Sequence, residues 1–216
     1  MTQNDLGLPP QDLNRPPVAA VVKGRRIGLL GGSFNPAHEG HRHISLHALH
    51  RLRLDEVWWL VSPQNPLKSA AETASLAKRM ERAAMVAAHP RIRVLDLESR
   101  LGTQYTIDSL HALRRRYPAT RFVWLMGADN WEGFHRWRAW REILHTVPVA
   151  ILDRPRYSVR SLATKAAQCF RRSRVAERDA WKLPQMTTPA WAFLHIPLHP
   201  QSATELRARN RNWLNT

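Results

Sequence analysis

The fold class is set by residues 26–61, which read RIGLLGGSFNPAHEGHRHISLHALHRLRLDEVWWLV. The first seven, RIGLLGG, form a short apolar run that ends in two glycines, a pattern typical of a buried strand followed by a tight turn. The segment HRHISLHALHRLRL then places apolar residues at mostly helical spacings, and EVWWLV is a second apolar run. This order predicts two parallel strands, because the connection between them holds a helix.

The same alternation continues along the chain. Further helices are expected at 72–88, 106–117 and 135–144, and further strands at 91–97, 121–127 and 147–154. Strands that alternate with helices indicate an α/β protein with a Rossmann-like, doubly wound parallel sheet, and the 216 residues suit a single domain. Beyond Arg154 the pattern weakens, and only a late strand at 191–196 and a final helix at 202–214 are expected.

The amino-terminal segment differs from the rest. Residues 1–24 are rich in Pro, Gln, Asn and Asp and have no apolar period, so we expect a flexible leader before a domain at 25–216. The leader lacks the basic and apolar regions of a secretory signal, and the longest apolar runs are too short to cross a bilayer. These features favour a cytoplasmic protein. Cys169 is the single cysteine, which excludes an internal disulfide.

The charge is strongly positive. The chain has 33 Lys and Arg against 17 Asp and Glu, a formal net charge of +16. This favours anionic partners such as nucleotides, nucleic acids or acidic membranes, without choosing among them. The basic residues are spread along the chain, and for any one cluster of them a solvated basic surface is the favoured explanation.

The first strand-to-helix turn, GGSFNPAHEGH at 31–41, is the main candidate for a phosphate site, because such turns bind phosphate in doubly wound sheets. It matches neither GxGxxG nor the P-loop pattern. His38 and His41 bracket Gly40, which allows close backbone approach, and His41 starts a helix whose amino terminus attracts anions. The two imidazoles can therefore donate hydrogen bonds to phosphate oxygens.

The other histidines of this helix could suggest a metal site, because His43 and His47 are four residues apart and His50 follows. The spacing within HEGH is not that of HExxH, and no acidic ligand is close in sequence, so we expect no protein-held metal. Surface or helix-packing roles account for these three histidines. Trp58 and Trp59 are expected in the core.

The turn GGSFNPAHEGH resembles the signature of the nucleotidyltransferase superfamily that carries HxGH after its first strand. Near the other end, SATELR at 202–207 resembles the second phosphate motif of that superfamily, SxTxxR at the start of a helix. The resemblance implies that both motifs meet around the triphosphate of ATP. By this resemblance, His38 and His41 are the catalytic pair. The ATP-binding residues that it implies are Gly31, Gly32, Ser33, Phe34, His38, His41, Ser202, Thr204 and Arg207.

Three further stretches narrow the resemblance to bacterial nicotinate mononucleotide adenylyltransferases: SPQNPLK at 62–68, TQYTIDSL at 103–110 and MGADNW at 126–131. By this resemblance, Asn65 and Lys68 lie near the phosphate or ribose of the substrate, Tyr105, Thr106 and Trp131 lie near its pyridine ring, and Asp129 lies beside the nucleotides. Asn35 departs from the family, in which many relatives have Asp, and we assign no metal ligand there.

The implied reaction is attack by the 5′-phosphate of nicotinate mononucleotide on the α-phosphorus of ATP, which gives deamido-NAD and pyrophosphate. Such a reaction needs alignment and charge neutralisation rather than a catalytic carboxylate, and Mg²⁺ would arrive with ATP. Two alternatives stay open. A related enzyme could transfer to a different phosphate acceptor, and a basic nucleic-acid-binding module would explain the charge but not the motifs. The sequence leaves the oligomeric state open.

Overall fold

The computed structural model of the chain describes residues 22–63, 73–155, 162–201 and 206. Within these residues, six parallel strands form one sheet in the order β3-β2-β1-β4-β5-β6. The strands are β1 (Arg26–Gly32), β2 (Glu56–Val61), β3 (Ile92–Leu95), β4 (Arg121–Gly127), β5 (Val149–Leu152) and β6 (Trp191–Leu194). The predicted Rossmann-like α/β fold is confirmed.

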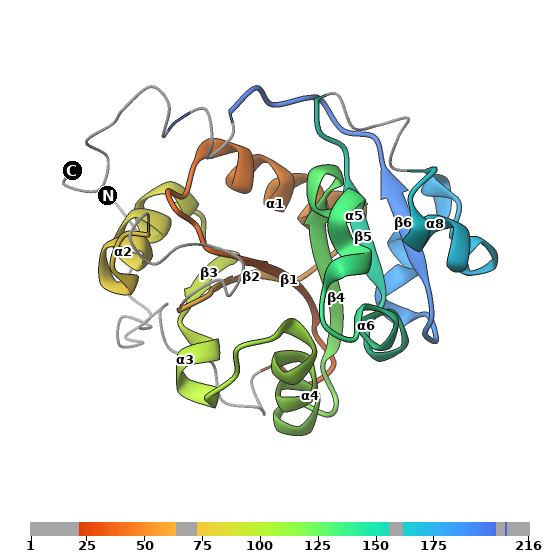
Figure 1. The fold of residues 1–216 in the computed structure, drawn as a ribbon, viewed down its shortest axis with the longest axis horizontal. Coiled ribbons are helices and arrows are strands. Elements are labelled where there is room, and N and C mark those ends of the chain that lie inside the picture. Colours follow the sequence, from red (N-terminus) through yellow and green to blue (C-terminus); the bar gives the residue numbers. More distant parts are fainter. Residues whose placement is uncertain (1–21, 64–72, 156–161, 202–205, 207–216) are drawn as a thin grey trace, which may run out of the picture.

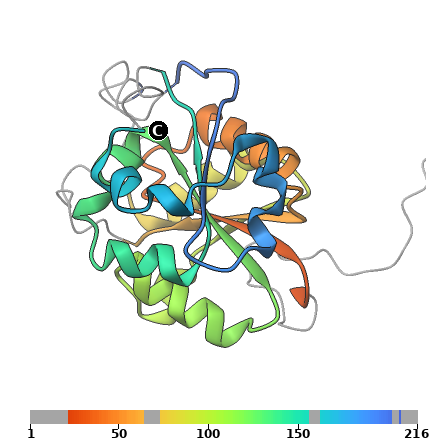
Figure 2. The same ribbon diagram turned by 90° about the vertical axis from the view of Figure 1, so that its right-hand side faces the viewer.

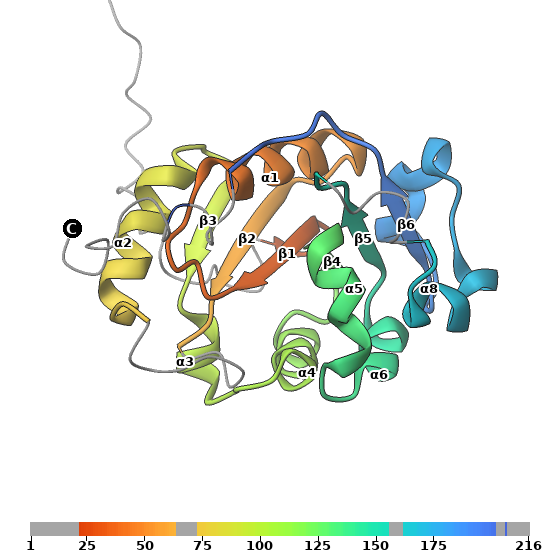
Figure 3. The same ribbon diagram turned by 45° about the horizontal axis from the view of Figure 1, so that its top comes forward.

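Helices cover both faces of the sheet, as Figure 1 shows. One face carries α1 (Glu39–Arg51), α2 (Leu76–Ala87) and the 3-10 helix η5 (Glu177–Gln185). The other carries α3 (Leu97–Leu101), α4 (Thr106–Arg116), α5 (Ala128–Gly133), α6 (Trp140–Thr146) and α8 (Lys165–Cys169). Figure 3 shows the same two layers with the top of the molecule turned forward.

Each face of the sheet has its own apolar core, because successive side chains of a strand point to opposite faces. Trp58 packs in the core beneath α4, and its neighbour Trp59 packs in the core beneath α1. Both are fully buried, which confirms that they are core residues. The buried strands therefore read as continuous apolar runs, as expected for a parallel sheet covered on both sides.

Three expectations about elements need correction. The helix expected at 135–144 is not continuous: the 3-10 helix η3 (Phe134–Arg136) ends at Arg136, and α6 begins only at Trp140, because Ala139 has a left-handed φ of 50°. The short helix α3 was not expected. The fold also begins before Arg25, since Val22 is fully buried and its carbonyl accepts a hydrogen bond from Thr120.

The segment between β5 and β6 closes the β6 edge of the sheet, which faces the viewer in Figure 2. Its described part contains α8, the 3-10 helix η4 (Arg171–Ser173) and η5. Ala166 of α8 belongs to one core and Leu183 of η5 to the other, so the segment packs on both faces. The final helix expected at 202–214 lies outside the described residues, except for Leu206, which is helical.

None of the helices in the described ranges combines the length and apolar character that a membrane span requires.

Candidate active site

The candidate site lies at the carboxyl edge of the sheet, where the chain changes direction. From β1 the chain moves to β2 and β3 on one side and then returns to β4 on the other, so β1 and β4 are neighbours at the switch point. Ligands of such sheets collect at this place. Gly31 and Gly32 end β1 here, and a Cβ on Gly31 would collide with the ring of Trp124.

His38 and His41 form the amino terminus of α1. Nδ1 of His38 accepts a hydrogen bond from the backbone N–H of Gly40 (3.1 Å), and Nδ1 of His41 accepts one from the N–H of His38 (3.2 Å). The ring centroids are 3.9 Å apart. Because each Nδ1 is an acceptor, each neutral imidazole carries its proton on Nε2 and can donate it to a ligand.

Burial keeps His38 neutral. The side chain is only 4% exposed. Burial, with smaller effects from the charges of Arg154 and His199, lowers its pKa to about 3. His38 is therefore a neutral hydrogen-bond donor near neutral pH rather than a cation.

A stacked set of side chains holds the histidine turn on the sheet. Phe34 stacks on Trp59 at 5.0 Å between centroids, and its ring lies 4.8 Å from that of His41. The hydroxyl of Ser45 donates to the carbonyl of His41 (2.8 Å) and accepts from the indole N–H of Trp59 (2.8 Å). The turn is thus fixed by the core before any ligand binds.

Arg154, which the sequence interpretation did not select, lies against the start of α1. It follows β5, and its side chain is 12% exposed. Its Nη1 donates to the carbonyl of Gln201 (3.3 Å), and its Nε lies 3.9 Å from a carboxylate oxygen of Asp129. A Cβ on Gly40 would lie 2.9 Å from both Nη1 of Arg154 and the carbonyl oxygen of Gln201, so only glycine fits. An arginine directly after a buried strand is the signal that could have identified it.

Gln201 immediately precedes SATELR. The described chain therefore brings the residue before the second motif into contact with the first motif. The residues Ser202, Thr204 and Arg207 themselves lie outside the described residues, as do Asn65 and Lys68.

Arg79 of α2 was also missed, and it holds the loops of the site together. The residue is 2% exposed, and its guanidinium donates to the carbonyls of Ser33, Ser62, Pro63 and Ala74 at 2.6–2.8 Å. Burial lowers its pKa from the ordinary value. Asn35 supports the same region, since its side-chain oxygen accepts from the N–H of Ala74 (3.1 Å).

Those predicted acceptor-side residues that the structure describes lie on the opposite face of the sheet from α1. Tyr105 caps α4, Thr106 is the first residue of that helix, and Asp129 lies in the first turn of α5 after β4. The guanidinium of Arg138 lies 4.5 Å from the centre of the Tyr105 ring, which adds a cation that the sequence interpretation did not consider.

Trp131 is placed differently from its expected position beside a pyridine ring. Its side chain is fully buried, stacks on Phe134 at 5.2 Å and lies 5.3 Å from the ring of Trp191. These core side chains cover the ring, so Trp131 supports α5 from within and offers no face to a ligand in this structure.

The described residues contain no group of three or more His, Cys, Asp or Glu side chains placed to hold a metal ion. His43 of α1 instead contacts the carbonyl of Pro197 at 2.6 Å and packs edge-on against His47. The charged and polar groups around the α1 terminus are mainly donors, which suit phosphate oxygens better than a cation.

Comparisons with known proteins agree with this geometry. Residues 29–209 match the family model described as cytidylyltransferase-like. A protein of Methylorubrum extorquens, named probable nicotinate-nucleotide adenylyltransferase, is 53% identical over 184 residues, which cover 85% of this chain and 100% of the relative. A protein of the same name from Parvibaculum lavamentivorans is 52% identical over 88% of this chain and 94% of the relative.

A solved structure is similar in fold. The nicotinic acid mononucleotide adenylyltransferase of Plasmodium falciparum, complexed with NaAD, has a TM-score of 0.64 and 18% sequence identity, over 85% of this chain and 83% of that one.

Proposed function

The chain belongs to the cytidylyltransferase-like family and, within it, to the nicotinate-nucleotide adenylyltransferases, and from this premise we propose how its residues act. Its activity is AMP transfer from ATP to nicotinate mononucleotide in NAD biosynthesis. In this reaction a 5′-phosphate oxygen bonds to the α-phosphorus of ATP, the bond to the β-phosphate breaks, and pyrophosphate leaves as an anion. Because the nucleophile is already anionic, the protein aligns the reactants and balances charge.

The observation that carries this proposal is the pair of neutral imidazoles at the start of α1. Both Nδ1 atoms accept backbone hydrogen bonds, which places the ring protons of His38 and His41 on Nε2, the atom from which each ring would donate to the phosphates of ATP. The amino terminus of α1 adds partial positive charge. Arg154 contributes a cation beside Gly40. These donors stabilise the charge that develops on the phosphates during transfer.

The remaining assignments follow the family resemblance. Around ATP they comprise the β1 turn and the second motif, namely Gly31, Gly32, Ser33, Phe34, Ser202, Thr204 and Arg207. The contact between Arg154 and Gln201 supports convergence of the two motifs, since Gln201 precedes the second. Around the mononucleotide they comprise Asn65, Lys68, Tyr105, Thr106 and Asp129. The fully buried Trp131 is left out of this set.

Mg²⁺ enters the proposal as the counter-ion of ATP. The donor-rich site fits an ion carried by the ATP phosphates and water rather than by a cage of protein carboxylates. When bound, the ion neutralises phosphate charge. That the reaction takes place in the cytoplasm stays a prediction from the sequence.

The test is pyrophosphate release from ATP and Mg²⁺ with nicotinate mononucleotide or nicotinamide mononucleotide as acceptor. We expect rapid release with the nicotinate form, slower release with the amide, and none when the acceptor is omitted or EDTA is present. If neither mononucleotide causes pyrophosphate release, the proposal is overturned. Other phosphate acceptors, such as phosphopantetheine, and a nucleic-acid ligand would then be tested next.

A further inference from the structure

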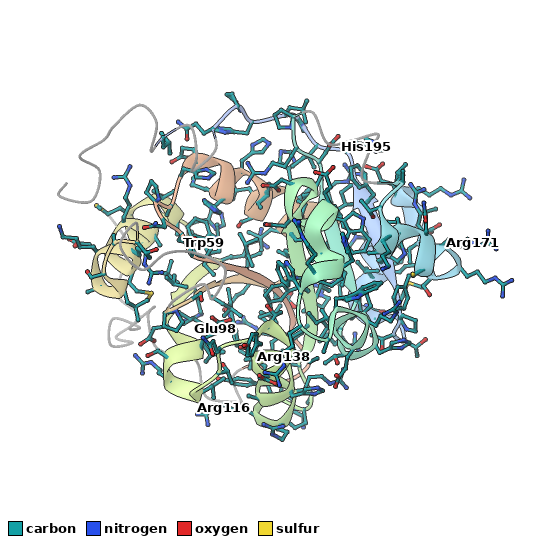
Figure 4. The ribbon with its side chains drawn as sticks, in the orientation of Figure 1. Trp59, Glu98, Arg116, Arg138, Arg171 and His195 are labelled. Carbon is teal, nitrogen blue, oxygen red and sulfur yellow. The ribbon has the colours of Figure 1, made fainter. Side chains whose placement is uncertain are left out.

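Glu98 of α3 is a buried acid that the proposed mechanism does not use. The residue is 5% exposed, and Figure 4 labels it on the α3 side of the sheet, opposite Trp59. Burial raises its pKa to about 7, against weaker opposing effects of hydrogen bonds from Ser62 and Ser109. A buried carboxyl group is costly, and a strongly shifted pKa beside a candidate site indicates a role beyond packing.

The contacts of Glu98 join two separate parts of the site. On one side its carboxyl group is hydrogen-bonded to the side chain of Ser62, the residue that follows β2. On the other it accepts from the hydroxyl of Ser109 in α4 (3.4 Å). The backbone carbonyl of Glu98 also accepts from the N–H of Thr103 (3.0 Å), just before α4.

Each of these partners is itself tied to the edge of the site. The N–H of Ser62 donates to the carbonyl of Gly32 at the end of β1 (2.9 Å), and Arg79 holds the carbonyl of Ser62. The hydroxyl of Ser109 lies 2.8 Å from that of Thr103 and 3.3 Å from the carbonyl of Tyr105. Glu98 therefore bridges the end of β2 and the turn that starts α4.

We propose that Glu98 is a positioning residue for the acceptor nucleotide, because its carboxyl group ties Ser62, directly after β2, to Ser109 in the first turn of α4. The inference rests on the proposed function, which assigns acceptor contacts to Tyr105 and Thr106 at the start of α4. The ATP side is held by separate contacts around His38 and Gly40. Loss of the bridge therefore affects the acceptor more than ATP.

The test compares Glu98→Ala with Glu98→Gln in steady-state kinetics. We expect Glu98→Ala to raise KM for nicotinate mononucleotide about tenfold or more while kcat and KM for ATP change less than about threefold. Glu98→Gln keeps an amide that can donate and accept hydrogen bonds, and we expect it to restore KM to within about threefold of the wild type. A general loosening of the fold would not separate the two substrates in this way.

Glu56→Ala is the matched control. Glu56 is another buried acid, 6% exposed, but it lies at the start of β2, at the opposite edge of the sheet, where it binds Arg25, Arg93 and Trp58. We expect this variant to unfold at lower temperature with both KM values unchanged. If Glu98→Ala does not fold, Ser109→Ala replaces it, with a smaller rise in the same KM.

The outcomes separate the two proposals. A wild-type protein that releases no pyrophosphate with nicotinate mononucleotide contradicts the proposed function. An active wild type overturns the role of Glu98 if Glu98→Ala or its substitute leaves KM for the acceptor unchanged, or raises both KM values equally. Failure of Glu98→Gln to restore KM would overturn the hydrogen-bonding role as well.

Discussion

At the scale of single residues, the proposed function gives helix capping and ligand binding to different nitrogens of the same rings. His38 and His41 each accept a backbone hydrogen bond through Nδ1, and this fixes the proton on Nε2. The sequence pattern could predict that two histidines flank a glycine at a helix start. It could not predict which ring nitrogen carries the proton, because that depends on the cap geometry.

This division of roles makes His38→Asn a sharper variant than His38→Ala. Asparagine keeps a side-chain acceptor for the helix cap but has no Nε2–H to reach the phosphates. We expect His38→Asn, and likewise His41→Ala, to lower kcat by about 10² to 10³ as preorganised donors are lost. Pyrophosphate release measures kcat, and circular dichroism checks that the fold is kept.

His50→Ala is the control for this prediction, because His50 is exposed on the same helix. We expect it to have wild-type activity. A His38→Asn or His41→Ala variant with near-normal turnover would remove that residue from the catalytic pair.

Glu98 also predicts how stability depends on pH. Its pKa is about 7 in the folded chain, above the ordinary value of 4.5, so folding takes up a proton between these values. The stabilisation is complete below pH 4.5 and is lost as pH rises towards 7, a difference of roughly 3 kcal/mol by linkage. Relative to Glu98→Gln, the wild type should therefore lose stability across this window.

Urea unfolding of both proteins at several pH values between 4.5 and 8 measures this difference. Subtracting the curve of Glu98→Gln removes the titration of surface groups shared by the two proteins. A difference that is flat with pH would show that the Glu98 carboxyl titrates near its ordinary value.

At the scale of elements, α2 holds the site loops through one buried side chain. Arg79 donates to four carbonyl groups that belong to the ends of β1 and β2 and to the start of α2. The planar guanidinium can serve several acceptors at once, and a lysine ammonium in its place cannot reach the same set.

We therefore expect Arg79→Met to lower the free energy of unfolding by about 2 kcal/mol or more, since buried carbonyls lose charged donors. Urea unfolding measures the change. Arg82→Met is the control, because Arg82 is exposed on the same helix and should be neutral. Wild-type stability of Arg79→Met would mean that water replaces the arginine without cost.

The strands and long helices could be predicted from the sequence, because apolar runs and helical spacing reflect burial directly. The break between η3 and α6 could not, since it depends on Ala139 adopting a left-handed φ, which alanine rarely does. Trp131 shows a similar limit. A motif places it beside the turn after β4, but only the packing of Phe134 and Trp191 shows that its ring is enclosed.

At the scale of the whole molecule, the site combines residues that are distant in sequence. Gly40 follows β1, Arg154 follows β5 and Gln201 follows β6, and they meet because these strands lie in one sheet in the order β1-β4-β5-β6. The prediction that the two phosphate motifs converge came from a family resemblance alone, and not from any pattern in the residues themselves. That Arg154 lies beside Gly40 could be learned only from the strand order, which no local sequence pattern encodes.

The net charge of +16 is also a property of the whole molecule, and it makes a separate prediction. A positive surface attracts anionic substrates over long distances, and salt screens this attraction with a Debye length of about 10 Å at 0.1 M. We expect kcat/KM for nicotinate mononucleotide to fall several-fold between about 20 and 200 mM NaCl, while kcat stays constant, because chemistry follows binding.

Steady-state kinetics over this salt series, with sucrose at matched osmolality as the control, separates electrostatic attraction from solvent effects. Addition of a DNA oligonucleotide at low salt tests the competing role of the charge. If the basic surface serves the substrates, the oligonucleotide inhibits weakly and only at low salt. Tight binding of the oligonucleotide that persists at about 200 mM NaCl would instead assign the charge to a nucleic-acid partner. In the kinetic series, a kcat/KM that does not change with salt would show that the charge does not attract the substrates.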